Sequence, residues 1–371
     1  MTKIKITYIL SNIDKAFAFE WVAEQLNKEQ FKLSFIILNS KGSYLFNWLQ
    51  KKGVESYFIE HHGKKSYPNT FFNTFRLLQK INPSIIHTHL FDANLIGLSA
   101  AKLLGIKKRI YTRHHSTYHH EYFPHAIKWD KLSNYLSTDI IAISENVKQV
   151  LIEKENVSNQ KIHLIHHGFD LKKFNKISPG LIVKLKEKYN LTNHTPVIGV
   201  ISRFLDLKGI QFIIPAFKQL LSQYPNAKLV LANATGPYKS KITNLLQQEL
   251  KPHQYQTIIF EPNLFALYQL FDLYVHVPIN NHIEAFGQTY VEALASGVPS
   301  VFTLSGVAND FIEHRKNALV VDYKNSEEIY QAITTILSDK ELSNSLIENG
   351  KKSISTFNLT LFIQKLEKLY V

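Results

Sequence analysis

The 371-residue sequence contains no cysteine, which excludes disulfide bonds, thiolate zinc sites and cysteine nucleophiles together. It also lacks any apolar run near the about 18 residues that a membrane span needs. The N-terminal MTKIKITYIL carries an apolar stretch too short for the core of a signal peptide. We find no tandem repeat and no low-complexity tail. We therefore expect a cytoplasmic, globular protein, and leave open contact with the inner face of a membrane.

The protein is strongly basic. Lysine and arginine number 43 against 30 acidic residues, a net charge of +13, so an anionic partner is expected. Nucleic acid, an acidic membrane surface and a phosphorylated substrate all fit this balance. The basic residues are spread over both halves, without the aromatic submotifs of RNA-binding sheets or a helix-turn-helix pattern. We therefore expect no nucleic-acid partner.

Short β-branched runs alternate with stretches of helical spacing, the pattern of an α/β protein with parallel sheets covered on both faces. The length favours two doubly wound Rossmann-like domains that face each other across a cleft. We predict domains at residues 1–175 and 176–355, and a C-terminal helix at 356–371 that packs on the first domain. The predicted strands are 4–10, 33–38, 56–59, 84–87, 110–112, 140–143, 162–165, 197–201, 228–232, 257–260, 273–277, 300–302 and 319–321.

Two acids flank a glycine in IEAFGQTYVEALASGVP: Glu284 and Glu292 stand on either side of Gly287. A buried strand and a polar loop should precede this glycine, and a helix should begin near it. The free N–H groups of Gly287, Gln288 and Thr289 would then form an anion site suited to phosphate. Carboxylates beside such a site fit a ligand that also carries sugar hydroxyls. A capping acid followed by a solvated acid is the alternative for this segment alone.

A second segment, VIGVISRFLDLKGIQFII, predicts a strand, a loop and a helix, with Arg203 and Lys208 in the loop. Arg203 offers a planar fork for phosphate oxygens, and Lys208 a mobile point charge. Two unrelated surface cations are the alternative. However, the loop follows the carboxyl end of a strand, where open α/β sheets bind ligands. A diphosphate could thus be neutralised here without a metal.

Six segments occur in a familiar order along nearly the whole chain: HTHLFDANLIGLSAAKLLGI, TRHHS, AISENV, IHHGFDLKKF, SRFLDLKG and EAFGQTYVEALASGVP. In this combination the sequence resembles the retaining glycosyltransferases of family 4, which have the GT-B fold. The resemblance implies sugar transfer from a UDP- or GDP-type donor, with retained configuration and with no metal or other cofactor. A lipid-linked or polysaccharide acceptor in cell-surface glycan synthesis, such as lipopolysaccharide, would account for a basic surface on a chain without membrane spans. The absence of Asp-x-Asp argues against metal-dependent transferases of the other common fold.

The resemblance also implies roles for individual side chains. Arg203 and Lys208 would hold the diphosphate, and Glu292 the ribose hydroxyls. Glu284 would contact the donor sugar, and His114 would face that sugar from the first domain. We expect Glu284, His114, Arg203 and Lys208 to be the catalytic group.

Backbone contacts are implied at further positions. Phe286 and Gly287 would touch sugar and phosphate. Gly306, in SGVAND, is what remains of a pair of glycines near the donor in the family. Where many members carry a glycine-rich loop after the first strand this chain has SNIDKAF, so the backbone of Ser11 and Asn12 should line the cleft instead.

Histidines are concentrated in HHSTYHHEYFPH, and His87 and His89 form an alternating pair. A metal site is the obvious alternative for such a cluster. Adjacent histidines point to opposite sides of a strand, and no carboxylate triad or HExxH pattern accompanies them. We therefore expect no metal, and interpret residues 115–129 as a loop and helix that face the acceptor.

Two other classes of function remain open on this fold. One is an epimerase or phosphorylase of nucleotide sugars, and the other is a basic binding protein without catalysis. Hydrolysis of the donor with retained configuration favours the transferase, and interconversion of free nucleotide sugars favours the epimerase. Salt-dependent polyanion binding without turnover favours the third class.

Overall fold

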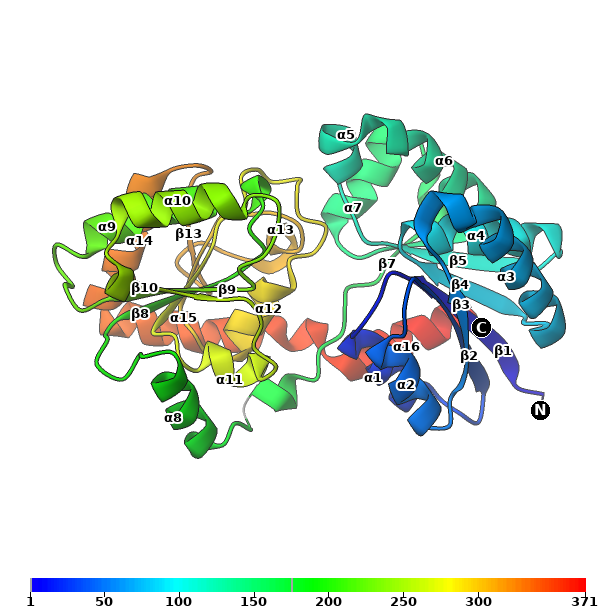
Figure 1. The fold of residues 1–371 in the computed structure, drawn as a ribbon, viewed down its shortest axis with the longest axis horizontal. Coiled ribbons are helices and arrows are strands. Elements are labelled where there is room, and N and C mark those ends of the chain that lie inside the picture. Colours follow the sequence, from blue (N-terminus) through cyan, green and yellow to red (C-terminus); the bar gives the residue numbers. More distant parts are fainter. Residues whose placement is uncertain (1, 175) are drawn as a thin grey trace. The chain divides into compact units, whose positions relative to one another are not determined.

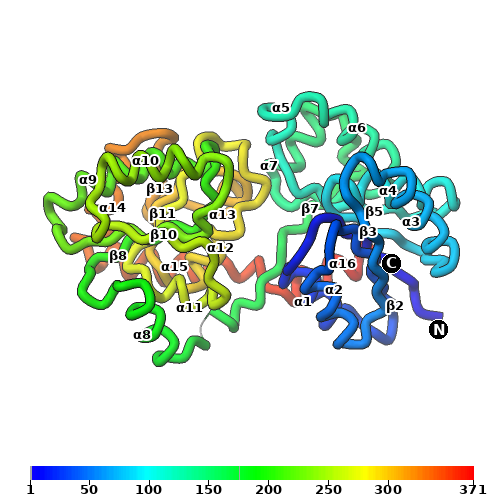
Figure 2. Tube along the Cα trace, in the orientation of Figure 1, coloured from blue at the N-terminus to red at the C-terminus, as the bar shows by residue number. Residues whose placement is uncertain are grey.

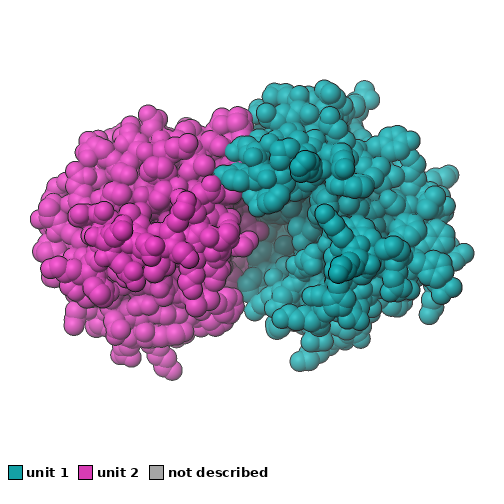
Figure 3. Space-filling view, turned by 45° about the horizontal axis from the view of Figure 1, so that its top comes forward, with its two compact units in different colours: residues 1–169, 359–371 teal, residues 170–358 magenta. Residues whose placement is uncertain are grey.

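The structure, a computed structural model, describes residues 2–174 and 176–371. The chain divides into two compact units (Figure 3): unit 1 takes Met1–Phe169 and Leu359–Val371, and unit 2 takes Asp170–Asn358. Each unit is a parallel sheet with helices on both faces, which confirms the predicted fold class. Residue 175, where the first predicted domain ends, lies outside the described residues.

The sheet of unit 1 is parallel throughout, in the order β3-β2-β1-β4-β5-β6-β7. Its inner strands are mostly apolar because helices cover both of their faces. The strands are β1 (Ile4–Ser11), β2 (Phe31–Asn39), β3 (Glu55–Glu60), β4 (Ile85–His89), β5 (Lys108–Arg113), β6 (Asp139–Ala142) and β7 (Ile162–Leu164).

Helices α3, α4 and α6 cover one face of this sheet, and α1, α2 and α16 cover the other (Figure 1). Gly97 lets α4 approach the sheet closely, because a β-carbon there would lie 2.8 Å from the side chain of Ile9. The helices of unit 1 are α1 (Phe17–Gln25), α2 (Tyr44–Lys51), α3 (Tyr67–Ile81), α4 (Phe91–Leu103), α5 (Tyr118–Tyr122), α6 (Ile127–Leu136), α7 (Glu145–Gln149) and α16 (Leu359–Tyr370).

The last helix, α16, belongs to unit 1 although all of unit 2 precedes it in the sequence. It packs beside α1 (Figure 2). Its Tyr370 is buried, and the hydroxyl bonds to the Tyr8 hydroxyl and, at 2.7 Å, to Nδ1 of His87. The chain therefore completes unit 1 with its final residues.

The sheet of unit 2 is also parallel, in the order β10-β9-β8-β11-β12-β13. The central strand β8, VIGVI, is buried along its whole length. The strands are β8 (Val197–Ile201), β9 (Lys228–Ala232), β10 (Tyr255–Ile258), β11 (Leu273–His276), β12 (Ser300–Phe302) and β13 (Leu319–Val320).

Helices α9, α10 and α14 cover one face of the second sheet, and α8, α11, α12 and α15 lie on the other (Figure 1). The two faces of the sheet are therefore closed. The helices are α8 (Pro179–Lys188), α9 (Ile210–Leu220), α10 (Lys239–Glu249), α11 (Leu264–Tyr268), α12 (Gln288–Ala295), α13 (Ala308–Phe311), α14 (Ser326–Ser338) and α15 (Lys340–Ser353).

Each strand predicted from the sequence is found within the described residues, and most ends agree to one or two positions. The edge strand β10 is the clearest shift, since 257–260 was expected and Tyr255–Ile258 is observed. Ile259 and Phe260 follow the strand and are 61% and 71% exposed, so apolar character alone misplaced its end. Across the described residues, every helix is too short or too polar to span a bilayer.

Candidate active site

The loop between β8 and α9 carries both predicted cations. Lys208 ends a 3₁₀ turn, Asp206–Lys208, and the next residue, Gly209, has a φ of +72°. A β-carbon at Gly209 would lie 1.9 Å from the carbonyl oxygen of Val277, so only glycine allows this turn to press against the end of β11. Arg203 is exposed and forms no ion pair with any described residue. The fold thus positions Lys208 firmly and leaves Arg203 available to a ligand.

Lys208 forms an ion pair with Glu284, which lies in the loop between β11 and α12. Glu284 is 7% exposed, and its backbone N–H donates to Oγ of Ser305 at 3.1 Å. Nε2 of His276, at the end of β11, lies 3.3 Å from the same carboxylate. The loop was expected to be polar, and within it Asn281 and His282 are exposed, while Glu284 is buried beside these partners.

The charge state of this group follows from its partners. Burial alone would raise the pKa of Glu284, but the Lys208 ammonium and the His276 ring hold that pKa well below its usual value. Burial lowers the pKa of His276, so this residue is a neutral ring beside the carboxylate rather than a second cation. Glu284 is therefore an ionised acceptor that cannot serve as a proton donor near neutral pH.

Helix α12 begins where the sequence predicted. Gly287 caps it with a φ of +83°, and a β-carbon there would meet the ring of Tyr290 at 2.6 Å. The N–H groups of Gly287, Gln288 and Thr289 find no backbone acceptor among the described residues. They therefore form a potential anion site at the start of the helix.

Glu292 lies one turn into α12 and is 8% exposed. Its Oε2 accepts a hydrogen bond of 2.8 Å from the Tyr268 hydroxyl of α11. Burial raises the pKa of Glu292 to about 7, and the Tyr268 hydrogen bond offsets only part of this effect. A solvated acid on a helix surface, the alternative interpretation, is therefore excluded.

We expect the raised pKa of Glu292 to make stability depend on pH. The folded protein holds a proton that the unfolded chain releases above about pH 4.5, so this stabilisation is present below that pH and is lost as the pH rises through about 7. The loss should reach about 3 kcal/mol in the free energy of unfolding. Urea denaturation of the wild type and of Glu292→Gln at pH 5 and pH 8 measures it. A difference between the two proteins that does not change with pH would contradict the assignment.

Gly306 approaches the same turn from the loop after β12. Its φ is +59°, and a β-carbon would lie 2.7 Å from the carbonyl oxygen of Phe286 and 2.9 Å from Cβ of Glu284. The N–H of Val307 donates to that carbonyl at 2.9 Å. The structure therefore brings Gly306, Phe286 and Glu284 together, while the Phe286 side chain itself is buried.

Ser11 and Asn12 lie in unit 1, at the carboxyl end of β1. Oγ of Ser11 accepts from the N–H of Ala93 at 3.2 Å. The N–H of Asn12 donates to the carbonyl of Leu38, and its side chain donates to Asp92 at 2.9 Å. These hydrogen bonds of Ser11 and Asn12 hold the start of α4 against the end of β1. Asn12 has a φ of 55°, so it adopts a left-handed conformation that glycine would also allow.

His114 follows β5 in unit 1. Its Nε2 lies 3.0 Å from Nδ1 of His89, and its ring stacks on that of His167 at 5.7 Å between centroids. Its surface is not fully covered, yet desolvation, with a further contribution from His167, His87 and other nearby rings, lowers the pKa of His114 well below its usual value. His114 is therefore a neutral ring whose orientation is fixed by other histidines.

Three partners of the predicted residues were not expected from the sequence: His276, Ser305 and Tyr268. His276 offered a signal, because it is the polar residue in an otherwise apolar strand, LYVH. Tyr268 and Ser305 offered none, since each reaches its partner across 21 or more residues of sequence.

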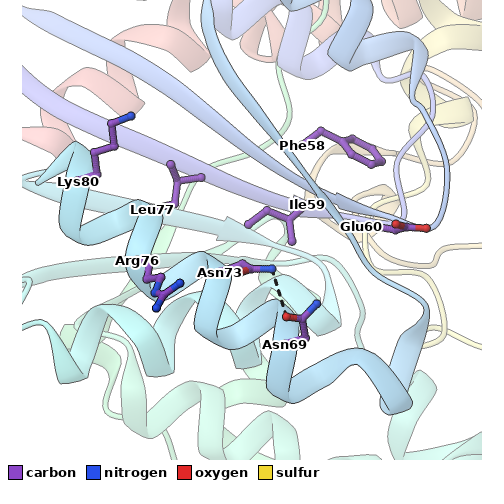
Figure 4. Close-up of a pocket in the computed structure, with 8 residues that line it drawn as sticks. All are labelled: Phe58, Ile59, Glu60, Asn69, Asn73, Arg76, Leu77 and Lys80. Atoms are coloured by element: carbon purple, nitrogen blue, oxygen red, sulfur yellow. Dashed lines mark hydrogen bonds between the residues drawn. The ribbon is translucent and has the colours of Figure 1, made fainter.

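A cavity of about 530 Å³ lies in unit 1 between β3 and α3 (Figure 4). It is lined by Phe58, Ile59, Glu60, Asn69, Asn73, Arg76, Leu77 and Lys80. None of the residues predicted from the sequence lines it. We therefore do not assign the donor to this cavity.

The two parallel sheets with their covering helices have the fold of the GT-B glycosyltransferases. Residues 22–173 match the family described as Glycosyltransferase Family 4, and residues 183–353 match Glycosyl transferases group 1. The chain belongs to this family, which confirms the resemblance seen in its sequence.

Individual relatives of the chain are also glycosyltransferases. The capsular polysaccharide biosynthesis glycosyltransferase CapM of Staphylococcus aureus is 26% identical over 360 residues, which cover 87% of this chain and 91% of that protein. The UDP-Gal:alpha-D-GlcNAc-diphosphoundecaprenol alpha-1,3-galactosyltransferase of Escherichia coli is 21% identical over 388 residues, with 100% and 97% covered. The crystal structure of Anabaena Alr3699/HepE in complex with UDP and glucose superposes with a TM-score of 0.85 at 18% identity, covering 99% of each chain. At this identity the superposition shows the shared fold.

Proposed function

We propose that this glycosyltransferase moves a sugar from a UDP- or GDP-type donor to a lipid-linked or polysaccharide acceptor in cell-surface glycan synthesis. Transfer retains the anomeric configuration and uses no metal at the donor. The observation that carries the proposal is the buried Lys208–Glu284 ion pair beside the free amides of α12. The relatives support it, since one makes capsular polysaccharide, one uses a diphosphoundecaprenol-linked acceptor, and one was solved with UDP and glucose.

In this proposal the cations of unit 2 stabilise the leaving group. The bond between the anomeric carbon and the diphosphate oxygen breaks, and negative charge gathers on that oxygen. The acceptor hydroxyl bonds to the same carbon, and its proton passes to the departing diphosphate. Arg203, Lys208 and the amides at the start of α12 supply positive charge that is already in place, which is usually the largest catalytic contribution.

The two glutamates then bind different hydroxyl groups of the donor. Glu284, held ionised by Lys208, accepts hydrogen bonds from the donor sugar. Glu292, beside Tyr268, accepts hydrogen bonds from the ribose hydroxyls once it has lost its proton. Because Lys208 contacts Glu284 directly, one ammonium group links the position of the sugar to that of the leaving diphosphate. His114 is assigned to the donor sugar by resemblance, as a neutral ring.

The exposed face of α6 supports contact with an anionic membrane. Trp129 is 42% exposed and Tyr135 is 71% exposed, while Phe123, just before the helix, is 51% exposed. Lys128 and Lys131 of the same helix are also exposed. Aromatic tips suit the membrane interface, and lysines attract acidic headgroups.

A transfer assay tests the proposal. The purified chain is given UDP- and GDP-hexoses and a prenyl-diphosphate-linked sugar acceptor, in anionic or in neutral vesicles. We expect an α-linked product from an α-linked donor, read from NMR coupling constants, with faster transfer on anionic vesicles. An inverted product would overturn retention, and donor affinity that requires added Mn²⁺ or Mg²⁺ would overturn metal independence. Interconversion of free nucleotide sugars without transfer would favour an epimerase.

A further inference from the structure

We propose that His115, His119 and Asp130 of unit 1 form a binding site for one transition-metal ion of the Zn²⁺ type. One ligand atom from each residue lies within 4.8 Å of the others. The site belongs to a different unit from Lys208 and Glu284. It therefore goes beyond the proposed transfer reaction, whose diphosphate is assigned to Arg203, Lys208 and the amides of α12.

The distances already approach those of a coordination shell. Nε2 of His115 lies 3.1 Å and Nδ1 of His119 lies 2.7 Å from the same oxygen, Oδ2 of Asp130. Ligand atoms bound about 2.0–2.1 Å from one zinc ion lie about 3 Å apart. Without an ion, the ring N–H groups donate to the carboxylate. An ion takes the place of those N–H protons when each ring carries its single proton on its other nitrogen, so small movements of the side chains are enough.

The chain builds this arrangement from a loop and two helices. After β5 the loop turns at Ser116, which is buried and accepts a hydrogen bond from the Asn146 side chain at 3.0 Å. His115 and His119 are four positions apart, and their rings lie 4.0 Å apart between centroids. Both face Asp130 on the buried side of α6. Sequence spacing missed the site because Asp130 stands eleven residues after the second histidine.

The charge around the site favours a cation. Arg113 makes its short contact with Glu155, at 2.5 Å, and lies 3.4 Å from each oxygen of Asp130. Two buried carboxylates, Asp130 and Glu155, therefore face one guanidinium, so the carboxylates exceed this fixed cation by one negative charge. A bound cation compensates this charge, which is costly to leave unpaired in a protein interior.

The donor set indicates the class of ion. Two imidazoles and one carboxylate suit Zn²⁺ and its neighbours Co²⁺ and Ni²⁺ better than Ca²⁺ or Mg²⁺. The side chains of His115 and His119 are 21% and 14% exposed, so water can reach the ion and complete its shell. His120, the next residue, lies 3.2 Å from Glu155 instead and is left out of the ligand set.

Titration of the full-length chain with ZnCl₂ alone, after treatment with EDTA and dialysis, tests the proposal. We expect one ion per chain by calorimetry, a rise in melting temperature, and a visible absorption band with Co²⁺. His115→Ala and His119→Ala should each weaken binding by at least about 100-fold, since even partners of the ligands typically matter by 10- to 100-fold. His120→Ala, the matched control, should stay within about threefold.

Wild-type protein that shows no saturable binding of Zn²⁺ or Co²⁺ would overturn the site, whatever the variants do. Unchanged affinity in both His115→Ala and His119→Ala would also overturn it, since the ion would then lie elsewhere. UDP-dependent stabilisation of the same variants reports whether they remain folded. Because UDP binding is assigned to unit 2, failure of the metal site leaves the proposed transfer standing, and failure of UDP binding leaves the metal titration interpretable.

Discussion

Lys208→Ala should lower kcat by about 100- to 1000-fold and remove most of the stabilisation that UDP or GDP gives to the wild type. The ammonium is lost from the leaving group, and the buried carboxylate of Glu284 is left facing the diphosphate without its partner. The free energy of unfolding should also fall, by about 3 kcal/mol, because removal of the Lys208 ammonium leaves the Glu284 carboxylate without its cationic partner. Thermal shift, calorimetry and turnover measurements check these three effects.

Lys218 provides a matched control in the same unit. It pairs with Glu249 at 2.8 Å, but its side chain is 57% exposed. Lys218→Ala should therefore change stability by less than about 1 kcal/mol and leave nucleotide binding unchanged. A Lys208→Ala protein that binds UDP as the wild type does would refute the assignment of this lysine to the diphosphate.

Glu284→Gln should separate turnover from binding. Turnover should fall by about 100-fold or more, since the charged acceptor that positions the donor sugar is lost. Affinity for UDP should stay constant or rise, because the Lys208 ammonium no longer shares its charge with a carboxylate. Steady-state kinetics and calorimetry with UDP distinguish the two quantities.

Glu292→Gln is the comparison variant for Glu284→Gln. Its side chain bonds to Tyr268 and makes no contact with Lys208, so its loss should affect nucleotide affinity rather than the chemical step. Were Glu284→Gln to lose UDP binding while keeping its turnover at saturating donor, the roles of the two glutamates would have to be exchanged.

Much of the fold could be predicted because buried parallel strands carry an unambiguous signal. Runs such as VIGVI at β8 and LVLA within β9 are apolar, and both strands are buried along their whole length. The edge strand β10 was misplaced because its apolar residues continue past the last pairing with β9. An edge strand has a neighbour on one side only, so pairing rather than composition decides where it ends.

The site could be predicted only where its chemistry is local in sequence. Gly287 and the amides of α12 follow from one segment, and Lys208 from one loop. The contact between Lys208 and Glu284 spans 76 residues, and it depends on the side-by-side pairing of β8 with β11. No periodicity encodes such a contact. The contact between His119 and Asp130 could not be predicted for the same reason, since no periodicity in the sequence encodes it.

The position of α16 constrains the order in which the protein can mature. Unit 1 lacks Ile363, Leu366 and Tyr370, which are buried, until the final dozen residues are available. During synthesis from the N-terminus, unit 2 thus has its whole sequence before unit 1 does. Until α16 is synthesised, the face of the first sheet near Tyr8 and Phe31 lacks its contacts with Tyr370, so the packing of the earlier half of the chain is completed only after the later half has been made.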